Sequence, residues 1–163
     1  MRKFLFILIA LFILTGCTVS PPPSIKQDII FLSKNSQTIT PKDTLLSWQT
    51  EFFKDQSFSH LENSSNITLN YAGLYRTIFE CSANNTGSNN EQVQWKIWNN
   101  NIELNASVSW SIHIPNSTRL SSISITNIHE FELNDTLFIT AIAAGNDMIT
   151  QIDTCRLIIE RIR

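Results

Sequence analysis

The sequence has few of the residues and none of the short motifs from which common catalytic sites are made. Its 163 residues include only four glycines and three cysteines. It contains no Gly-x-Ser-x-Gly elbow, Walker loop or dinucleotide fingerprint, and so few glycines leave little material for a loop that cradles phosphate. Because any sequence this rich in serine could supply a Ser-His-Asp set, the lack of a motif argues against a hydrolase. We expect no catalytic residues and no cofactor.

Metal ligands are also absent in the spacings that usually hold an ion. The three histidines, His60, His113 and His129, are isolated along the chain, and no His-x-x-x-His, Cys-x-x-Cys or Asp-rich calcium loop occurs. We expect all three histidines on the surface, and the sequence predicts no metal site.

Positive charge is scattered and slightly outnumbered. The chain has 12 Lys and Arg against 14 Asp and Glu, and no basic stripe or basic helix appears in it. This composition argues against nucleic acid as a partner and against a membrane-binding surface built on charge.

Only one long apolar run is present, at the start of the chain. Arg2 and Lys3 precede the segment 4–14, and Thr15-Gly16-Cys17 follows it. The run is shorter than the roughly 20 residues that cross a bilayer, but it suits the apolar part of a signal peptide. Leu14-Thr15-Gly16-Cys17 resembles a bacterial lipobox, in which the cysteine receives lipid and becomes the new N-terminus. A plain signal peptide with a chance cysteine, or a retained membrane helix, is the alternative.

The lipobox interpretation divides the chain into three parts: a signal peptide (1–16), a lipidated cysteine with a Pro-rich tether (17–27), and one domain (28–163). Each buried methylene contributes about 0.8 kcal/mol, so two or three acyl chains on Cys17 would give a stable membrane anchor. We expect a location in the bacterial cell envelope. Thr18, in place of an Asp after the cysteine, favours the outer membrane if the cell has two.

The remaining cysteines, Cys81 and Cys155, form an even pair in a chain that we expect to reach an oxidising compartment. A disulfide between them would add about 4 kcal/mol on the chain-entropy model. Two free buried thiols are the alternative.

Hydrophobic residues beyond position 28 alternate with polar ones, which predicts an all-β domain. The composition agrees, because Ser, Thr, Asn and Ile are frequent while the good helix formers are scarce. One segment, 45–54, could be a helix or a strand. The alternating sets are Ile67, Leu69 and Tyr71; Val93, Trp95 and Ile97; Val108, Trp110, Ile112 and Ile114; Ile123 and Ile125; and Leu137, Ile139 and Ala141.

One strand pairing can be predicted with its register. Segment 73–81 is laid antiparallel to 155–163 with Cys81 opposite Cys155. This places Arg76 opposite Glu160, Glu80 opposite Arg156, Phe79 opposite Leu157 and Ile78 opposite Ile158. A slip of one residue would remove these matched pairs, so together they select the register. Thr77, Phe79 and Cys81 would then face inward, and the opposite face would suit an oligomer interface.

Several segments resemble the tumour-necrosis-factor-like and complement-globular-head domains. Gly73 and Tyr75 match the Gly-x-Tyr turn of that family. Asn134 and Asp135 stand where the family usually has Gly-Asp, and asparagine tolerates a left-handed turn. The segments 95–101 and 155–162 are similar to two further family strands. The resemblance spans roughly residues 28–163.

This resemblance implies a jelly roll of two sheets and about ten strands, usually assembled as a homotrimer. The sequence has no Gly-x-y repeat, so it contains no collagen stalk. An immunoglobulin-like sandwich is the alternative fold, although Cys81 and Cys155 are too far apart for its usual disulfide.

The function that follows is a lipid-anchored, non-enzymatic surface module, a trimeric head that recognises a protein or a glycan. Trp98, Phe53 and Phe58 are candidate contact aromatics. A structural envelope lipoprotein that packs against a partner in a secretion or cell-wall assembly is the second hypothesis, and a hydrolase is the third.

Overall fold

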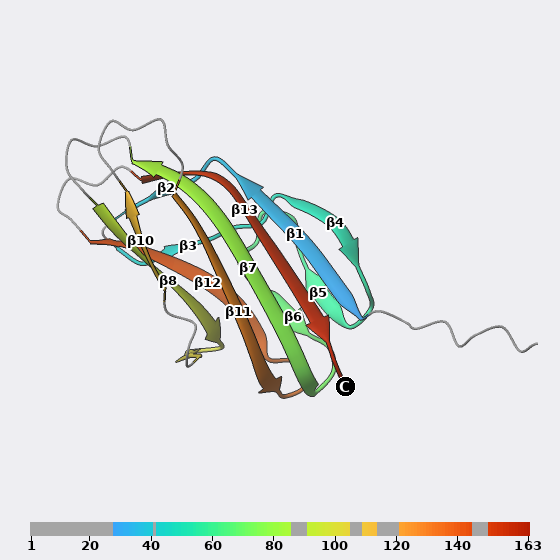
Figure 1. Ribbon diagram of the computed structural model, residues 1–163. Helices are drawn as coiled ribbons and strands as arrows, with labels where there is room; N and C mark the ends of the chain where they lie inside the picture. Colours follow the sequence, from blue (N-terminus) through green and yellow to red (C-terminus); the bar gives the residue numbers. More distant parts are fainter. Residues whose placement is uncertain (1–27, 41, 86–90, 105–108, 114–120, 145–149) are drawn as a thin grey trace, which may run out of the picture.

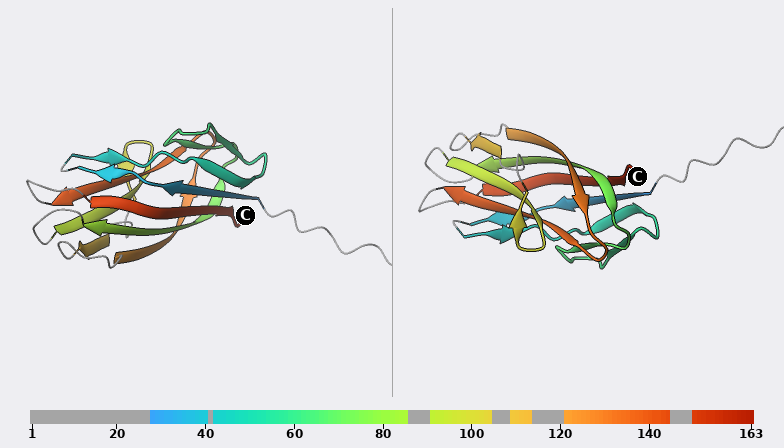
Figure 2. Two further views of the ribbon diagram at one scale, coloured as in Figure 1. Left: turned by 90° about the horizontal axis from the view of Figure 1, so that it is seen from above. Right: turned by 90° about the horizontal axis from the view of Figure 1, so that it is seen from below.

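The computed structural model describes residues 28–40, 42–85, 91–104, 109–113, 121–144 and 150–163. In this part of the chain all regular structure is β, and two antiparallel sheets pack face to face as a sandwich (Figures 1 and 2). The predicted two-sheet β architecture is therefore confirmed. The described residues form thirteen strands instead of about ten, because several pieces of two or three residues join the sheets.

Six strands form the first sheet, called sheet A here. Their order is β11 (Ser121–Phe131), β7 (Gly73–Asn85), β13 (Thr150–Arg161), β1 (Ile29–Asn35) and β4 (Thr50–Lys54), with β2 (Thr38–Ile39) beside β13. The three long strands β11, β7 and β13 run side by side along the front of Figure 1.

Seven strands form the second sheet, called sheet B. Their order is β10 (Ser109–His113), β8 (Glu91–Asn99), β12 (Thr136–Ala144), β6 (Ile67–Leu69) and β5 (Phe58–His60); β3 (Thr44–Leu45) lies beside β12 and β9 (Ile102–Glu103) beside β8. Neighbouring strands of sheet A, and the β8–β12 and β12–β6 neighbours of sheet B, are not consecutive in the sequence, which is typical of a jelly roll. The β5–β6 and β8–β9 pairs of sheet B are consecutive.

The predicted pairing of β7 with β13 is confirmed residue by residue. Cys81 lies opposite Cys155, and the four other matched pairs are present in the same register: Arg76 with Glu160, Ile78 with Ile158, Phe79 with Leu157, and Glu80 with Arg156. Strand β13 is central to sheet A, with β7 on one side and β1 on the other.

The core lies between the sheets and is formed by the inward-facing residues of the alternating strands. Phe79 from sheet A packs against Trp95 from sheet B, with ring centroids 5.5 Å apart, and Trp48 meets the edge of Phe79 at 6.4 Å. The predicted inward set of β7, which includes Thr77 and Cys81, is buried. Burial of one large apolar side chain contributes roughly 1.5–3 kcal/mol, so these contacts are the main source of stability.

The segment that could have been a helix contains no helix. Residues 50–54 form β4, an edge strand whose five residues are all exposed. Leu46 donates its backbone N–H to the carbonyl of Ile139 at 3.0 Å. Tertiary hydrogen bonding of this kind overrides the helical spacing of the apolar residues. Tyr71 also departs from its predicted set, because it lies in the turn before β7 and is exposed.

The Gly-x-Tyr turn depends on a hydrogen bond from Tyr75 and on the absence of a side chain at Gly73. The Tyr75 ring is buried, and its hydroxyl donates to the carbonyl of Tyr71 at 2.7 Å. Burial is the main cause that raises the pKa of the Tyr75 phenol. Gly73 has φ of +156°, and a Cβ on it would lie 2.3 Å from the carbonyl oxygen of Arg163.

The turn between β11 and β12 explains the Asn134-Asp135 pair. Asn134 has φ of +66°, the left-handed conformation expected for the residue that stands in place of glycine. The Asp135 carboxylate accepts hydrogen bonds from the backbone N–H of Glu132 and from the side-chain amides of Asn99 and Asn100, at 2.7–2.9 Å. Burial acts to raise the pKa of Asp135, but these hydrogen bonds and the nearby His129 outweigh it, so the pKa is lowered.

The first described residue and the C-terminal residues meet at one end of the sandwich (Figure 1). The backbone carbonyl of Asp28 accepts a hydrogen bond from the backbone N–H of Arg161 at 2.8 Å. No helix within the described residues has the length and apolar character needed to cross a membrane. The apolar segment 4–14 and Cys17 lie outside the described residues.

Candidate functional site

The outer face of sheet A carries the candidate site. Because the odd-numbered residues of β7 face the core, its even-numbered residues face outward, and the registers place outward side chains of neighbouring strands in rows. One row contains Ser122, Ser82, Thr154 and Asn35, taken from β11 across to β1; the next contains Ser124, Glu80, Arg156 and Ser33. Eight polar side chains from four strands thus form one continuous patch.

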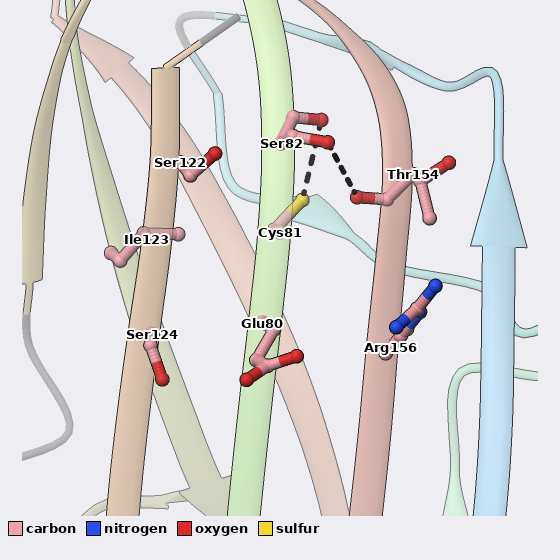
Figure 3. Close-up of a pocket in the computed structure, with 8 residues that line it drawn as sticks. All are labelled: Glu80, Cys81, Ser82, Ser122, Ile123, Ser124, Thr154 and Arg156. Atoms are coloured by element: carbon pink, nitrogen blue, oxygen red, sulfur yellow. Dashed lines mark hydrogen bonds between the residues drawn. The ribbon is translucent and has the colours of Figure 1, made fainter.

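A hollow of about 500 Å³ lies over β11, β7 and β13, and is called the polar groove here. Figure 3 shows its side chains on three adjacent strands. The polar residues that line it are Glu80, Ser82, Ser122, Ser124, Thr154 and Arg156. Cys81 and Ile123, whose side chains are buried or nearly so, also line it.

The two predicted charge pairs of this face differ in the structure. Arg76 and Glu160 form an ion pair. Glu80 and Arg156 are exposed and in register, yet neither makes an ion pair or a side-chain hydrogen bond with another described residue. The polar groove therefore presents a carboxylate and a guanidinium whose hydrogen-bonding groups are available (Figure 3).

A second hollow of about 420 Å³ adjoins the polar groove and shares Thr154 and Arg156 with it. Its other side is aromatic. The rings of Phe31 on β1 and Phe52 on β4 stack with centroids 4.9 Å apart, and Phe52 is 62% exposed. We call this second hollow the aromatic hollow. Arg156 thus lies between the polar groove and the aromatic hollow.

The part of the same face nearer the C-terminus is more apolar. Ile128 on β11 is 57% exposed, and Leu74 and Ile78 on β7 are half-buried. The Arg76–Glu160 ion pair lies among them, because Ile128 is the partner of Arg76 in the next strand. We call this the apolar half of sheet A.

The cysteine pair lies directly beneath the polar groove. Cys81 and Cys155 form a disulfide between β7 and β13, and both residues are buried. The disulfide connects the two central strands that carry Glu80 and Arg156.

The histidines have different surroundings, and one prediction about them is wrong. His129 is exposed as expected, whereas the His60 side chain is buried. Its Nε2 lies 3.3 Å from the carbonyl of Ser64, and its Nδ1 lies 3.5 Å from the Glu51 carboxylate. The sequence around His60 did not show this, because β5 has only three residues and so short an alternation carries little information. The side chain of His113 lies outside the described residues.

The three candidate contact aromatics also differ in their exposure. Phe53 is exposed on β4, as expected of a contact residue. Phe58 is buried, so that prediction is wrong; it packs against Tyr75 with centroids 6.0 Å apart. Trp98 is half-buried and donates its indole N–H to the Thr140 hydroxyl at 2.8 Å.

The chemistry of the polar groove suits hydrogen-bonded recognition. Its hydroxyls can donate and accept, the carboxylate only accepts when ionised, and the guanidinium only donates. Its described lining contains no histidine next to a serine, the arrangement that activates a serine nucleophile. Within the described residues, no three His, Cys, Asp or Glu side chains are grouped so that they could hold a metal ion.

Comparisons with known proteins identify the fold. No protein-family model matches the sequence, and no curated protein is significantly similar to it. Among solved structures, the globular domain of zebrafish complement 1qA protein is similar, with a TM-score of 0.58 and 9% identity over 85% of this chain and 98% of that one. Murine APRIL is similar with a TM-score of 0.55 and 9% identity, over 83% and 99% of the two chains.

At such low identity these similarities establish the fold alone. The chain has the two-sheet jelly roll of the complement-globular-head and tumour-necrosis-factor-like domains, as the sequence resemblance predicted. The comparisons do not support the alternative of an immunoglobulin-like sandwich. One fold supports many functions, so the function depends on the surface of this chain.

Proposed function

We propose that this chain is a lipid-anchored, non-enzymatic binding module of the bacterial cell envelope, with a trimeric head that recognises a protein or a glycan. The observation that carries the proposal is the outer face of sheet A. It combines an open polar groove, whose carboxylate and guanidinium are unpaired among the described residues, with an exposed apolar half.

The apolar half of sheet A supports self-association. Exposed Ile128 and half-buried Leu74 and Ile78 provide apolar area, and the Arg76–Glu160 pair provides polar contacts beside it. Interfaces between identical chains combine an apolar centre with charged groups in this way. The resemblance to trimeric jelly rolls favours three copies.

The proposed anchor rests on Cys17 and the segment that follows it. Ten residues lie between Cys17 and Asp28, so an extended tether could reach at most about 40 Å from one to the other. Asp28 lies at the end of the sandwich that also holds Arg161. Attachment there would leave the opposite end of sheet A, with the polar groove, directed away from the membrane.

The anchor predicts a change of location when Cys17 is replaced. In a bacterium that processes lipoproteins, the full chain should sediment with membranes and incorporate labelled fatty acid. The Cys17→Ser variant should lose the label, because serine has no thiol to receive lipid. Thr18→Ser is the matched control and should behave like the native chain. Equal labelling of the native chain and Cys17→Ser would contradict the proposed anchor.

A further inference from the structure

We propose that a second copy of this chain covers the polar groove, and that Arg156 of each copy pairs with Glu80 of its neighbour in the trimer. This inference rests on the trimeric head of the proposed function, and it names the charged residues through which the copies recognise each other.

The polar groove continues directly from the apolar half of sheet A. On β7, Glu80 lies two residues beyond Ile78 on the same face, and on β13, Arg156 lies two residues before Ile158. Alternate residues of a strand are roughly 6.6 Å apart, so the charged row is the next row of outward side chains. A copy that packs on Ile78 and Ile158 therefore also reaches Glu80 and Arg156.

The apolar half is too small to hold two copies together by itself. Its outward side chains occupy three rows across β11, β7 and β13. At about 4.8 Å between strands and about 6.6 Å between rows, this is roughly 300 Å² of sheet. Stable interfaces cover about 800 Å² on each partner. Contact between copies has to extend further, and the polar groove adjoins the apolar half on the same three strands.

Covering the polar groove removes water from two charges that lack a partner within one copy. Glu80 and Arg156 are exposed cross-strand neighbours, yet they form no ion pair among the described residues. In Figure 3 the Arg156 guanidinium extends towards β1, on the side away from Glu80. A charge that is covered without a partner strongly disfavours an interface. Each of the two charges therefore needs an opposite charge on the neighbouring copy.

Three-fold symmetry provides these opposite charges. A closed ring of three copies uses two different surfaces of each copy, so a residue of one copy meets a different residue of the next. One glutamate and one arginine per copy thus give three identical ion pairs with no charge left over. The planar guanidinium fork matches a carboxylate with two parallel hydrogen bonds.

The hydroxyl side chains of the polar groove suit the same contact. The Ser82 hydroxyl and the Thr154 hydroxyl have only long contacts of 3.4 Å, to the Thr154 carbonyl and to the Asn35 side chain. Because a hydroxyl can both donate and accept, it can bond to an equally polar surface directly or through water. Another copy of the groove is such a surface.

Charge reversal tests the proposed pairing, with sedimentation equilibrium of the full chain in a density-matched detergent as the measurement. The native chain should be trimeric. Glu80→Arg and Arg156→Glu should each weaken association by about tenfold or more, because each variant places like charges opposite one another. The double variant Glu80→Arg with Arg156→Glu restores opposite charges and should associate within roughly threefold of the native chain.

Mixing the two single variants distinguishes pairing between copies from pairing within one copy. In a mixed ring, Arg156 of the Glu80→Arg chain meets Glu80 of the Arg156→Glu chain. The mixture should therefore associate about tenfold or more tightly than either variant alone. Every copy in the mixture still carries two like charges, so pairing within a copy would give no such gain. At 0.15 M salt, general attraction between charges more than about 8 Å apart is largely screened.

The matched control is Glu62→Arg, which reverses an exposed glutamate between β5 and β6 of sheet B and should leave association unchanged. Thermal unfolding of each variant shows that the fold is kept. A trimeric native chain whose two single variants associate normally, or show no gain on mixing, would overturn the pairing and leave the proposed head intact. A monomeric native chain would overturn both, and this outcome is seen without any variant.

Discussion

Replacing both cysteines of the central strand pair, as Cys81→Ala with Cys155→Ala, should lower the free energy of unfolding by about 4 kcal/mol. The disulfide joins positions 74 residues apart, and opening a loop of this length restores much conformational freedom to the unfolded chain. For a domain of this size the midpoint of thermal unfolding should fall by roughly 15 °C. The measurement is chemical unfolding of the native chain and the double variant under oxidising conditions.

Reductant provides the control for this effect. It should destabilise the native chain to a similar extent and leave the double variant unchanged, because the variant has no bond to reduce. Thiol labelling of the unfolded chain without reductant should find neither Cys81 nor Cys155 reactive. Two reactive thiols in protein from an oxidising compartment would contradict the disulfide.

Gly73→Ala should lower the free energy of unfolding by about 3 kcal/mol, although it adds one methyl group. The added Cβ would lie 2.3 Å from the Arg163 carbonyl, which accepts the backbone N–H of Leu74 at 2.8 Å. Relief of the clash requires moving backbone that is held in sheet A, and φ of +156° is itself unfavourable for alanine.

The neighbouring residue supplies a matched control for Gly73→Ala. Ala72 is exposed, so Ala72→Ser should change the stability by less than about 0.5 kcal/mol. Chemical unfolding of both variants compares them directly. A Gly73→Ala protein as stable as Ala72→Ser would show that the strand end can shift to admit a side chain, contrary to the packing described above.

Much of the fold could be predicted because its signals are local or paired. Alternation identified the buried residues of β8 and β12, and the matched sequences of β7 and β13 contained enough charge and apolar pairs to select one register. The left-handed conformation of Asn134 was expected from the resemblance, which places it where the family usually has glycine. Such features depend on a few residues whose partners are recognisable by type.

The candidate site could not be predicted because its residues come from four strands and none of them stands out. Ser122 and Ser124 are two serines among many, and their position beside Glu80 depends on the β11–β7 register, which no sequence pattern indicated. The sequence also predicted two cross-strand charge pairs, and among the described residues Arg76–Glu160 forms an ion pair whereas Glu80–Arg156 does not. Exposed cross-strand charges gain little from pairing, so side-chain geometry decides which pairs form.

The burial of His60 and Phe58 could not be predicted from the sequence either. Both lie in β5, a strand of three residues, where so short an alternation carries little information. Tertiary packing against Tyr75 and the neighbourhood of Glu51 decides their environment.

The mass of the jelly roll in solution tests its proposed self-association most directly. Residues 25–163, produced without the segment before them, should elute as a single species of three times the monomer mass by light scattering after gel filtration. Ile128→Glu should convert it to a monomer, because a charge would then lie in the apolar half of sheet A. Leu45→Glu, an equivalent change at an exposed residue of sheet B, should leave the trimer intact. A native protein that remains monomeric at every concentration would contradict the account.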